Sequence, residues 1–219
     1  MIIEPLPADI VQVRPAGRIR RRNEQAILNA AEAEFARHGF KGASMNAIAL
    51  AVGLPKANLH YYFSSKLGLY MAVLKNILEL WDSSFSQLDA SDDPADALSA
   101  YIRTKMEFSR RKPLTSRVFA MEIISGGERL DAYLGENHQH WFRSRAGVFQ
   151  SWIDSGRMDP VDPCHLIFLI WSSTQHYADF YAQICLFTGK RRLSADDYQR
   201  AADSLVQIVL KGCGLKAEH

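Results

Sequence analysis

The chain has 219 residues and a formal net charge of +2, with 47% hydrophobic and 23% charged residues. This balance is typical of a folded globular chain and excludes an intrinsically disordered one. The longest apolar run, 166–171, is too short to span a membrane, and residues 1–13 lack the pattern of a secretion signal, so we expect a cytoplasmic protein.

The first 22 residues have no helical periodicity and end in three consecutive arginines, Arg20, Arg21 and Arg22. Residues 1–75 hold ten Lys or Arg against five Asp or Glu, a net charge of +5, so the remainder carries −3. A basic front end on an acidic body indicates a polyanionic partner for the front end. We interpret 1–22 as a flexible basic arm, which either stays solvated or follows the phosphates or minor groove of a duplex.

From residue 23 onward, apolar residues recur at helical spacing, and only 13 Gly and 8 Pro occur in the whole chain. This pattern predicts an all-α fold of nine helices. The predicted helices cover 23–38, 45–52, 56–63, 66–82, 94–108, 114–124, 130–155, 165–184 and 194–211.

Residues 44–63 hold the most specific pattern, two short helices that meet at a glycine. Ser44 is a good N-cap for the first helix, Ala49 is small enough for a helix crossing, and Gly53 suits a turn with positive φ. Apolar residues at 48, 52, 54 and 59 would lock the two helices together. The spacing predicts a helix-turn-helix, with an ordinary helical hairpin as the alternative, and the basic front end favours DNA binding.

The second helix of this pair carries side chains suited to DNA. Lys56 and Asn58 suit base edges or phosphates, and the hydroxyls of Tyr61 and Tyr62 can reach phosphates, although a place in the core is the alternative for either tyrosine. Lys66 begins the next helix, where its charge and the free amides would hold a phosphate. The predicted DNA-binding residues are Arg20, Arg21, Arg22, Ser44, Lys56, Ala57, Asn58, His60, Tyr61, Tyr62 and Lys66.

Two motifs in this region carry a family resemblance. Residues 27–40 read I-L-x-A-A-x-x-x-F-x-x-x-G-F, and 48–66 read I-A-x-x-x-G-L-x-K-x-x-L-x-x-Y-F-x-x-K. Together they resemble the tetracycline-repressor (TetR) family of transcriptional regulators. The chain departs from the family pattern at His60, where a tyrosine is usual, and at Ser64, where a proline or aspartate is usual.

The rest of the chain narrows the resemblance. Residues 162–180 read D-P-x-H-L-I-F-x-I-W-x-S-T-Q-H-Y-A-D-F, which together with Phe119-Ala-Met121-Glu122 resembles the pyrimidine-utilisation regulators of that family. The resemblance implies a homodimer that binds a palindromic operator in double-stranded DNA and responds to a small-molecule effector such as uracil or thymine. We therefore divide the chain into the arm, a DNA-binding domain over 23–70, and a ligand-binding and dimerisation domain over 71–219.

The predicted helix 165–184 has an unusual run of polar residues at its centre. Buried hydroxyls and amides need partners, and a flat heterocycle with alternating donors and acceptors would supply them while a tryptophan stacks on its face. The alternative is a dimer seam with these polar residues paired across it, and the family resemblance implies that the last two helices build the dimer interface. The candidate ligand-binding residues are Trp81, Trp171, Thr174, Gln175 and Tyr177.

Other classes of function find little support in the sequence. No nucleotide-binding or nucleophile motif occurs, so we expect neither an enzyme nor a cofactor. His138 and His140 face different sides of a helix, and His165 and His176 lie too far apart to share a metal. The remaining alternative is a TetR-type regulator that senses an unrelated molecule, such as a drug-efflux regulator, but the polar residues at 173–175 favour a small polar ligand.

Overall fold

The computed structural model describes residues 15–216, and within this range the side chains of residues 15, 16, 18 and 132–138 are not described. The expectation for 1–14 of the arm lies outside the described residues. The helices in chain order are α1 (Pro15–Gly42), α2 (Met45–Ala51), α3 (Lys56–Tyr62), α4 (Lys66–Phe85), α5 (Pro94–Arg111), α6 (Pro113–Ile124), α7 (Glu128–Asp154), α8 (Pro163–Asp179), α9 (Tyr181–Thr188) and α10 (Ala195–Gly212).

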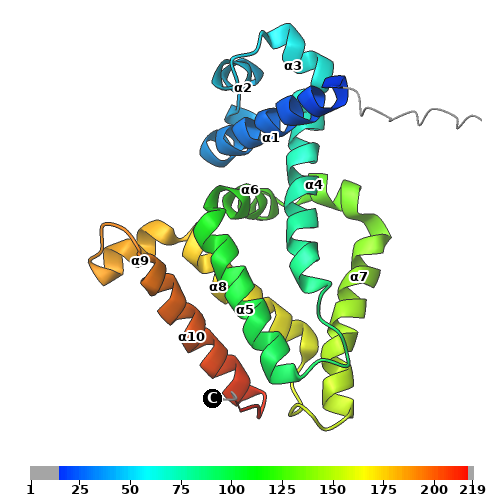
Figure 1. The fold of residues 1–219 in the computed structure, drawn as a ribbon, viewed down its shortest axis with the longest axis vertical. Helices are drawn as coiled ribbons and strands as arrows, with labels where there is room; N and C mark the ends of the chain where they lie inside the picture. Colours follow the sequence, from blue (N-terminus) through cyan, green and yellow to red (C-terminus); the bar gives the residue numbers. More distant parts are fainter. Residues whose placement is uncertain (1–14, 217–219) are drawn as a thin grey trace, which may run out of the picture.

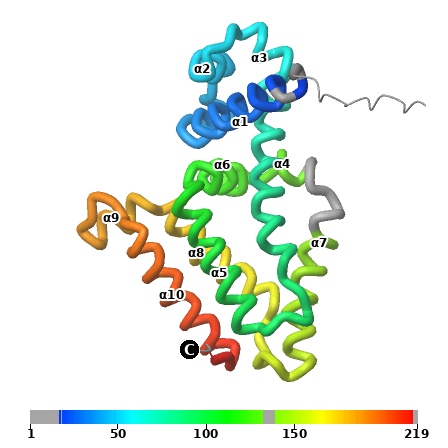
Figure 2. Tube along the Cα trace, in the orientation of Figure 1, coloured from blue at the N-terminus to red at the C-terminus, as the bar shows by residue number. Residues whose placement is uncertain are grey.

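The helices form a small head and a larger body (Figure 1). The head consists of α1, α2 and α3, and α4 runs from the head down into the body. In the body, α5 packs against both α8 and α10. Helix α7 lies along the side of α4 that faces away from α5. Helix α6 crosses directly beneath α1, so it lies where head and body meet (Figure 2).

Each part has its own hydrophobic core. The head core includes Ile27, Phe35, Ile48 and Leu59, all of them buried. The body core is built on large side chains such as Phe85, Phe149 and Trp152. Burying a side chain of this size contributes roughly 1.5–3 kcal/mol. The head core also takes up Val118 of α6 and Leu130 of α7, so the two parts share buried surface instead of meeting only through α4.

Local sequence signals set most helix ends. Five helices begin at a Ser or Asp whose side chain accepts a hydrogen bond from a backbone amide of the first turn, which satisfies a donor that has no partner within the helix. These N-caps are Ser44, Ser65, Asp93, Asp162 and Ser194. The sequence predicts nine helices, whereas the described residues form eleven helical segments. One additional segment arises because α1 breaks at Gly39 (φ 65°), and the other because the predicted helix 165–184 divides into α8 and α9.

Two sequence expectations need correction. The helix predicted from residue 23 begins at Pro15, so Arg20, Arg21 and Arg22 stand on the first turns of α1 and not in a flexible arm. Proline suits a first helical turn, and after Gly17, near the helix start, no glycine or proline follows before Gly39. The predicted helix 165–184 breaks at Phe180, whose backbone (φ −110°, ψ 27°) is not helical, although no glycine or proline marks that point. No helix within 15–216 is both long and apolar enough to cross a membrane.

Candidate nucleic-acid interface and a buried polar cavity

Helices α2 and α3 form the helix-turn-helix that the sequence predicts. Ala49 and Leu59 are buried at the contact between them. Gly53 has a φ of 67°, and the amide of Leu54 donates to the carbonyl oxygen of Ala49 at 3.0 Å. The amide of Gly53 donates to the carbonyl oxygen of Leu50 at 3.1 Å, which completes a Schellman ending. The tight turn between the helices therefore depends on a glycine at this position.

One face of α3 is free for a partner. Leu59 is fully buried and fixes the helix to the head core, whereas Lys56, Ala57, Asn58 and His60 are exposed. The His60 ring nitrogen Nδ1 lies 3.4 Å from the carbonyl oxygen of Ser64, so this side chain folds back along its own helix end. These exposed side chains lie on the sides of α3 that do not pack on the head core, and a helix exposed in this way fits a DNA major groove.

The two tyrosines of α3 differ in their surroundings. Tyr61 is 71% exposed, and the guanidinium of Arg20 lies 5.7 Å from its ring centroid. Tyr62 is half-buried, and its hydroxyl accepts a hydrogen bond from the Asn23 amide at 3.2 Å. The start of α1 is thus held against the end of α3. This contact places the exposed arginines of α1 next to the exposed face of α3.

Two of the predicted DNA-binding residues already have structural roles within the head. Ser44 caps α2, and its own amide donates to Glu34 Oε1 at 3.0 Å. The Lys66 ammonium donates to the carbonyl oxygens of Lys41 and Ala43, at 3.2 Å and 3.1 Å. It also lies 5.0 Å from the centroid of the Phe40 ring. In this structure, Lys66 therefore holds the end of α1 and does not project toward α3.

The body contains a small polar cavity between α4, α5, α6 and α8. The residues that line it are Trp81, Lys105, Phe108, Ser109, Lys112, Ser116 and Gln175. Two residues singled out from the sequence, Trp81 and Gln175, thus meet at one site. The side chains almost fill the space, which has room for about one water molecule.

Lys105 is the most unusual residue of this cavity. Its side chain is 4% exposed, and its ammonium lies 4.5 Å from the centroid of the Trp81 ring. Burial lowers the pKa of Lys105 to about 8, although the charge of the nearby Asp179 carboxylate opposes part of this decrease. The pKa of Asp179 is raised, mainly because burial disfavours its charge. A buried ammonium over an aromatic ring, with a half-buried carboxylate near it, forms a site that can hold a polar molecule.

Some polar atoms around this cavity lack a partner. Asp179 Oδ1 and Ser116 Oγ are both buried, and neither makes a hydrogen bond of good geometry. The Ser116 hydroxyl is nevertheless close enough to Asp179 to oppose the rise in its pKa. Ser109, by contrast, donates to the carbonyl oxygen of Thr174 at 2.8 Å. Buried groups without partners are costly, so Ser116 and Asp179 are ready acceptors or donors for a bound molecule.

Three of the candidate ligand-binding residues do not line the cavity. The indole NH of Trp171 donates to the Tyr101 hydroxyl at 2.6 Å, and its ring packs into the body core. Thr174 is fully buried, and its hydroxyl donates to the carbonyl oxygen of Ile170 at 2.8 Å. Tyr177 packs beside Tyr198 of α10, at 6.0 Å between ring centroids. On α8 only Gln175 points at the cavity, because the other three face α5 or α10 or bond back to their own helix.

The sequence interpretation missed Lys105, Ser116 and Asp179. Lys105 shares the buried face of α5 with Leu98, Ile102 and Ser109. A lysine within such an apolar stripe was the available signal, because lysine is almost never buried without a partner. Ser116 and Asp179 gave no comparable signal, since each is an ordinary polar residue until the helices are packed.

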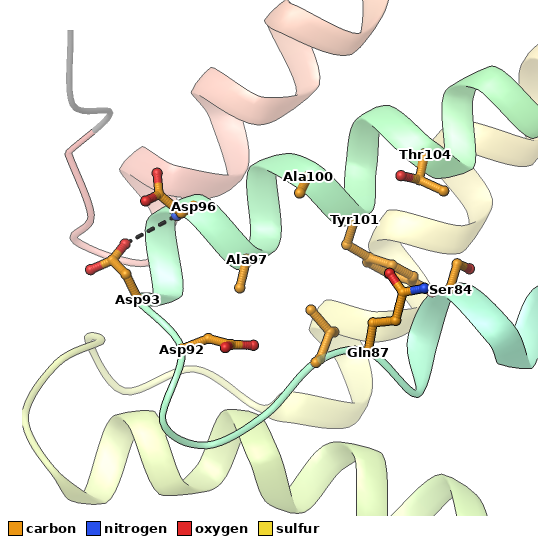
Figure 3. Close-up of a pocket in the computed structure, with 10 residues that line it drawn as sticks. Ser84, Gln87, Asp92, Asp93, Asp96, Ala97, Ala100, Tyr101 and Thr104 are labelled. Atoms are coloured by element: carbon orange, nitrogen blue, oxygen red, sulfur yellow. Dashed lines mark hydrogen bonds between the residues drawn. The ribbon is translucent and has the colours of Figure 1, made fainter.

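A second hollow lies between the end of α4 and the start of α5 (Figure 3). Three aspartates, Asp92, Asp93 and Asp96, stand around it. Asp93 is already engaged as an N-cap, and its Oδ1 accepts from the amides of Ala95 and Asp96 at 2.9 Å and 3.0 Å. The acidic residues here stabilise the local turn and the start of α5. This hollow therefore lacks the buried ammonium and aromatic ring that mark the cavity beside Lys105.

Two family models together match most of the chain. The model described as "Bacterial regulatory proteins, tetR family" matches residues 27–73, and "YcdC-like protein, C-terminal region" matches residues 74–216. The chain belongs to the TetR family. Members of this family are DNA-binding transcriptional regulators that respond to ligands, and not enzymes.

Curated relatives and solved structures agree with this assignment. The chain is 38% identical to the HTH-type transcriptional regulator RutR of Escherichia coli strain K12 over 189 residues, which cover 86% of this chain and 89% of that protein. It is 28% identical over 141 residues to the HTH-type transcriptional repressor NicS of Pseudomonas putida, covering 62% and 64% of the two chains.

Among solved structures, the ketosteroid regulator KstR2 of Mycobacterium tuberculosis has a TM-score of 0.69 at 19% identity, covering 89% of this chain and 95% of that one. AibR in complex with isovaleryl coenzyme A and operator DNA has a TM-score of 0.65 at 21% identity, covering 85% and 97%. These likenesses show that the fold is the TetR fold.

Proposed function

We propose that this TetR-family regulator binds a palindromic operator as a homodimer and that its effector is a small pyrimidine such as uracil or thymine. The observation that carries the effector proposal is the cavity beside Lys105, where a buried ammonium and the primary amide of Gln175 line the space with the Trp81 ring. The half-buried Asp179 carboxylate lies near that ammonium. The sequence resemblance to the pyrimidine-utilisation regulators supports the same ligand class.

The chemistry of a pyrimidine dione complements this cavity. Its carbonyl oxygens accept hydrogen bonds, which the Lys105 ammonium and the Gln175 amide can donate, and its ring NH groups donate to acceptors such as the Ser116 hydroxyl. Trp81 offers a ring face on which a flat heterocycle stacks. A bound pyrimidine would also give a partner to the buried Ser116 hydroxyl, and that gain favours a ligand with donors and acceptors over an apolar drug.

Binding in this cavity requires the lining to move. The space holds about one water molecule, whereas a pyrimidine is a six-membered ring with substituents. The helices that line the cavity must therefore separate, or side chains such as Trp81 must turn aside. An effector that binds only the widened cavity shifts the protein toward that arrangement, by an amount set by its differential affinity.

Calorimetry tests the effector proposal directly. We expect heat of binding for uracil or thymine with the wild-type protein, and loss of binding by about tenfold or more in Lys105→Met, because one charge-assisted hydrogen bond is worth roughly 1.5–3 kcal/mol. Lys75→Met is the matched control, since Lys75 is an exposed lysine on α4. Binding of a cationic dye with no binding of uracil or thymine would favour the drug-sensing alternative.

The DNA-binding proposal rests on the exposed face of α3 and the arginines at the start of α1. The residues that we propose to contact DNA are Arg20, Arg21, Arg22, Ser44, Lys56, Ala57, Asn58, His60, Tyr61 and Tyr62. Selection of duplexes from a random pool, followed by titration, tests this surface. We expect Asn58→Ala to cost about 1–3 kcal/mol on the selected duplex but little on unrelated DNA, because base contacts carry the specificity. Equal losses on both duplexes would remove Asn58 from the base-reading residues.

The homodimer proposal rests on apolar side chains exposed along α8, α9 and α10. These residues are Phe168, Leu169, Leu186, Phe187 and Ile208. These helices expose several large apolar side chains, and the family resemblance implies that the last two helices build the dimer interface, so we propose that a second copy of the chain covers these side chains. Phe187→Glu should shift the mass measured by light scattering from dimer to monomer. Leu50→Glu is the control, because Leu50 is equally exposed but lies on α2 of the head. A wild-type protein that is already monomeric would refute the proposal.

A further inference from the structure

A polar cleft lies where the head meets the body. Its walls are the last turn of α1, the start of α4, the end of α6 and the start of α7. Its volume is about 420 Å³, which falls within the range of small-molecule sites, roughly 300–1,000 Å³. We call it the junction cleft, and it shares no lining residue with the cavity beside Lys105. The polar side chains that line the junction cleft include His38, Lys41, Glu122, Ser125, Glu128 and Arg129.

One wall of the junction cleft contains a buried carboxylate that is already paired. Glu122 is 2% exposed and accepts a hydrogen bond from the Tyr70 hydroxyl of α4 at 3.0 Å. It also accepts from the backbone amide and from the guanidinium of Arg129, the second residue of α7, each at 3.1 Å. Burial and the Glu122 charge raise the pKa of Tyr70, so its hydroxyl stays protonated as a donor. Glu122 thus joins α4, α6 and α7, and Arg129 balances its charge.

Arg129 keeps hydrogen-bond donors that are free for a ligand. Its Nη1 bonds to Glu122, and its guanidinium lies 4.3 Å from the centroid of the Phe40 ring, a contact that holds the guanidinium in place. The side chain is 30% exposed, and its Nε and Nη2 make no hydrogen bond to any residue that the structure describes. A planar pair of N–H donors on the wall of a cleft suits the two oxygens of a carboxylate.

Two oppositely charged side chains at the edge of the junction cleft have no partner of their own. Lys41, in the last turn of α1, and Glu128, the first residue of α7, are both exposed. Neither forms an ion pair with any side chain that the structure describes. Because Arg129 balances Glu122, the cleft is left with one unpaired cation and one unpaired anion. A molecule that carries both charges complements this pattern better than a simple anion or a simple cation.

We propose that the junction cleft binds a free amino acid in its zwitterionic form. The carboxylate of the amino acid accepts from Nε and Nη2 of Arg129 and pairs with the Lys41 ammonium, while its α-ammonium pairs with Glu128. Ser125 and His38 line the remaining space, which favours a polar side chain over an aliphatic one. The site does not depend on the pyrimidine proposal, because the effector cavity is built from other residues.

Calorimetry with amino acids and their derivatives tests which charges the site reads. We expect heat of binding for at least one of serine, asparagine and glutamine, whose side chains are polar and uncharged. The N-acetyl derivative of that amino acid lacks the ammonium, and its amide derivative lacks the carboxylate, so both should lose measurable binding. No binding of any of the three amino acids, or a derivative that binds as tightly as its parent, would overturn the proposal.

Variants of the two unpaired charges test the position of the site. Lys41→Met and Glu128→Gln should each weaken amino-acid binding by about threefold to tenfold, because each removes one charged contact that solvent partly screens. The matched controls are Lys75→Met and Glu79→Gln, an exposed lysine and an exposed glutamate of α4, and both should keep the wild-type affinity. Wild-type affinity in both Lys41→Met and Glu128→Gln would overturn the proposal.

Two further variants separate this site from the rest of the molecule. Arg129→Lys keeps a charge beside Glu122 but loses the paired donors, so it should weaken binding of the amino acid while thermal unfolding shows that the protein stays folded. If Arg129→Lys does not fold, the Lys41 and Glu128 variants decide. Lys105→Met should bind the amino acid as the wild type does. Loss of amino-acid binding in Lys105→Met would place the ligand in the effector cavity and overturn the junction site.

Discussion

Lys66 offers a sharp test, because the sequence and the structure assign it different roles. From the sequence, Lys66 at the start of α4 is expected to hold a DNA phosphate. In the structure its ammonium donates to two backbone carbonyls at the end of α1 and lies over the Phe40 ring. These carbonyls lie in and just after the last turn of α1, where a cation also meets the negative end of the helix dipole. The contacts therefore predict that Lys66→Met lowers stability.

The expected size of this effect follows from the contacts that are lost. A hydrogen bond to a charged group contributes about 1.5–3 kcal/mol when it is well buried, and a cation–π contact about 0.5–1 kcal/mol at an exposed site. Lys66 is only half-buried, and water replaces part of each contact, so we expect a net loss of about 1–2 kcal/mol. For a chain of this length, that loss lowers Tm by about 2–8 °C.

Thermal unfolding and DNA titration together decide between the two roles. Lys66→Met should lower Tm, while Lys75→Met, an exposed lysine on the same helix, should leave it within about 1 °C, since surface ion pairs contribute little. The slope of log affinity against log salt should match that of the wild type. An unchanged Tm with a slope reduced by about one would refute this reasoning and restore the phosphate contact.

Three further predictions follow from single residues. Burial lowers the pKa of Lys105 to about 8, so between about pH 8 and pH 10 the unfolded chain holds a proton that the folded chain has lost, and the free energy of unfolding rises with pH. Lys105→Met should flatten this rise in thermal unfolding across that range, and a slope equal to the wild type would contradict the burial of the charge. Gly53→Ala should cost about 1–2 kcal/mol, measured by urea unfolding, because a φ of 67° strains any residue with a Cβ. Gly147→Ala should have the opposite sign and stabilise the protein by about 0.5–1 kcal/mol, since Gly147 lies within α7 with nothing near its Cβ position. Destabilisation by Gly147→Ala would show that α7 does not tolerate a side chain there.

The local parts of the fold were predictable from the sequence. The helix-turn-helix depends on a glycine at the turn, a small residue at the crossing and apolar residues at fixed spacing, and each of these is readable within about twenty residues. The caps Ser44 and Asp162 were likewise readable, since an N-cap acts on the next turn of its own helix. The break at Phe180 was not, because no residue type marks it.

The cavity was predictable only in part. Trp81 and Gln175 were singled out and do line it, whereas Trp171, Thr174 and Tyr177 lie outside its lining. Successive residues on a helix point in different directions, so each of them meets a different neighbouring helix.

The sequence alone determined where most of the helices lie, which two of them form the DNA-binding motif, and which family the chain resembles. Tertiary structure alone decided that Lys66 holds the end of α1, that Lys105 is buried beside Asp179, and that Glu122 joins three helices. The physical reason is the distance along the chain over which each interaction acts. Capping, helical periodicity and turn conformation act over a few residues, whereas the pKa of a buried charge and the partners of a buried carboxylate depend on atoms from helices distant in the chain.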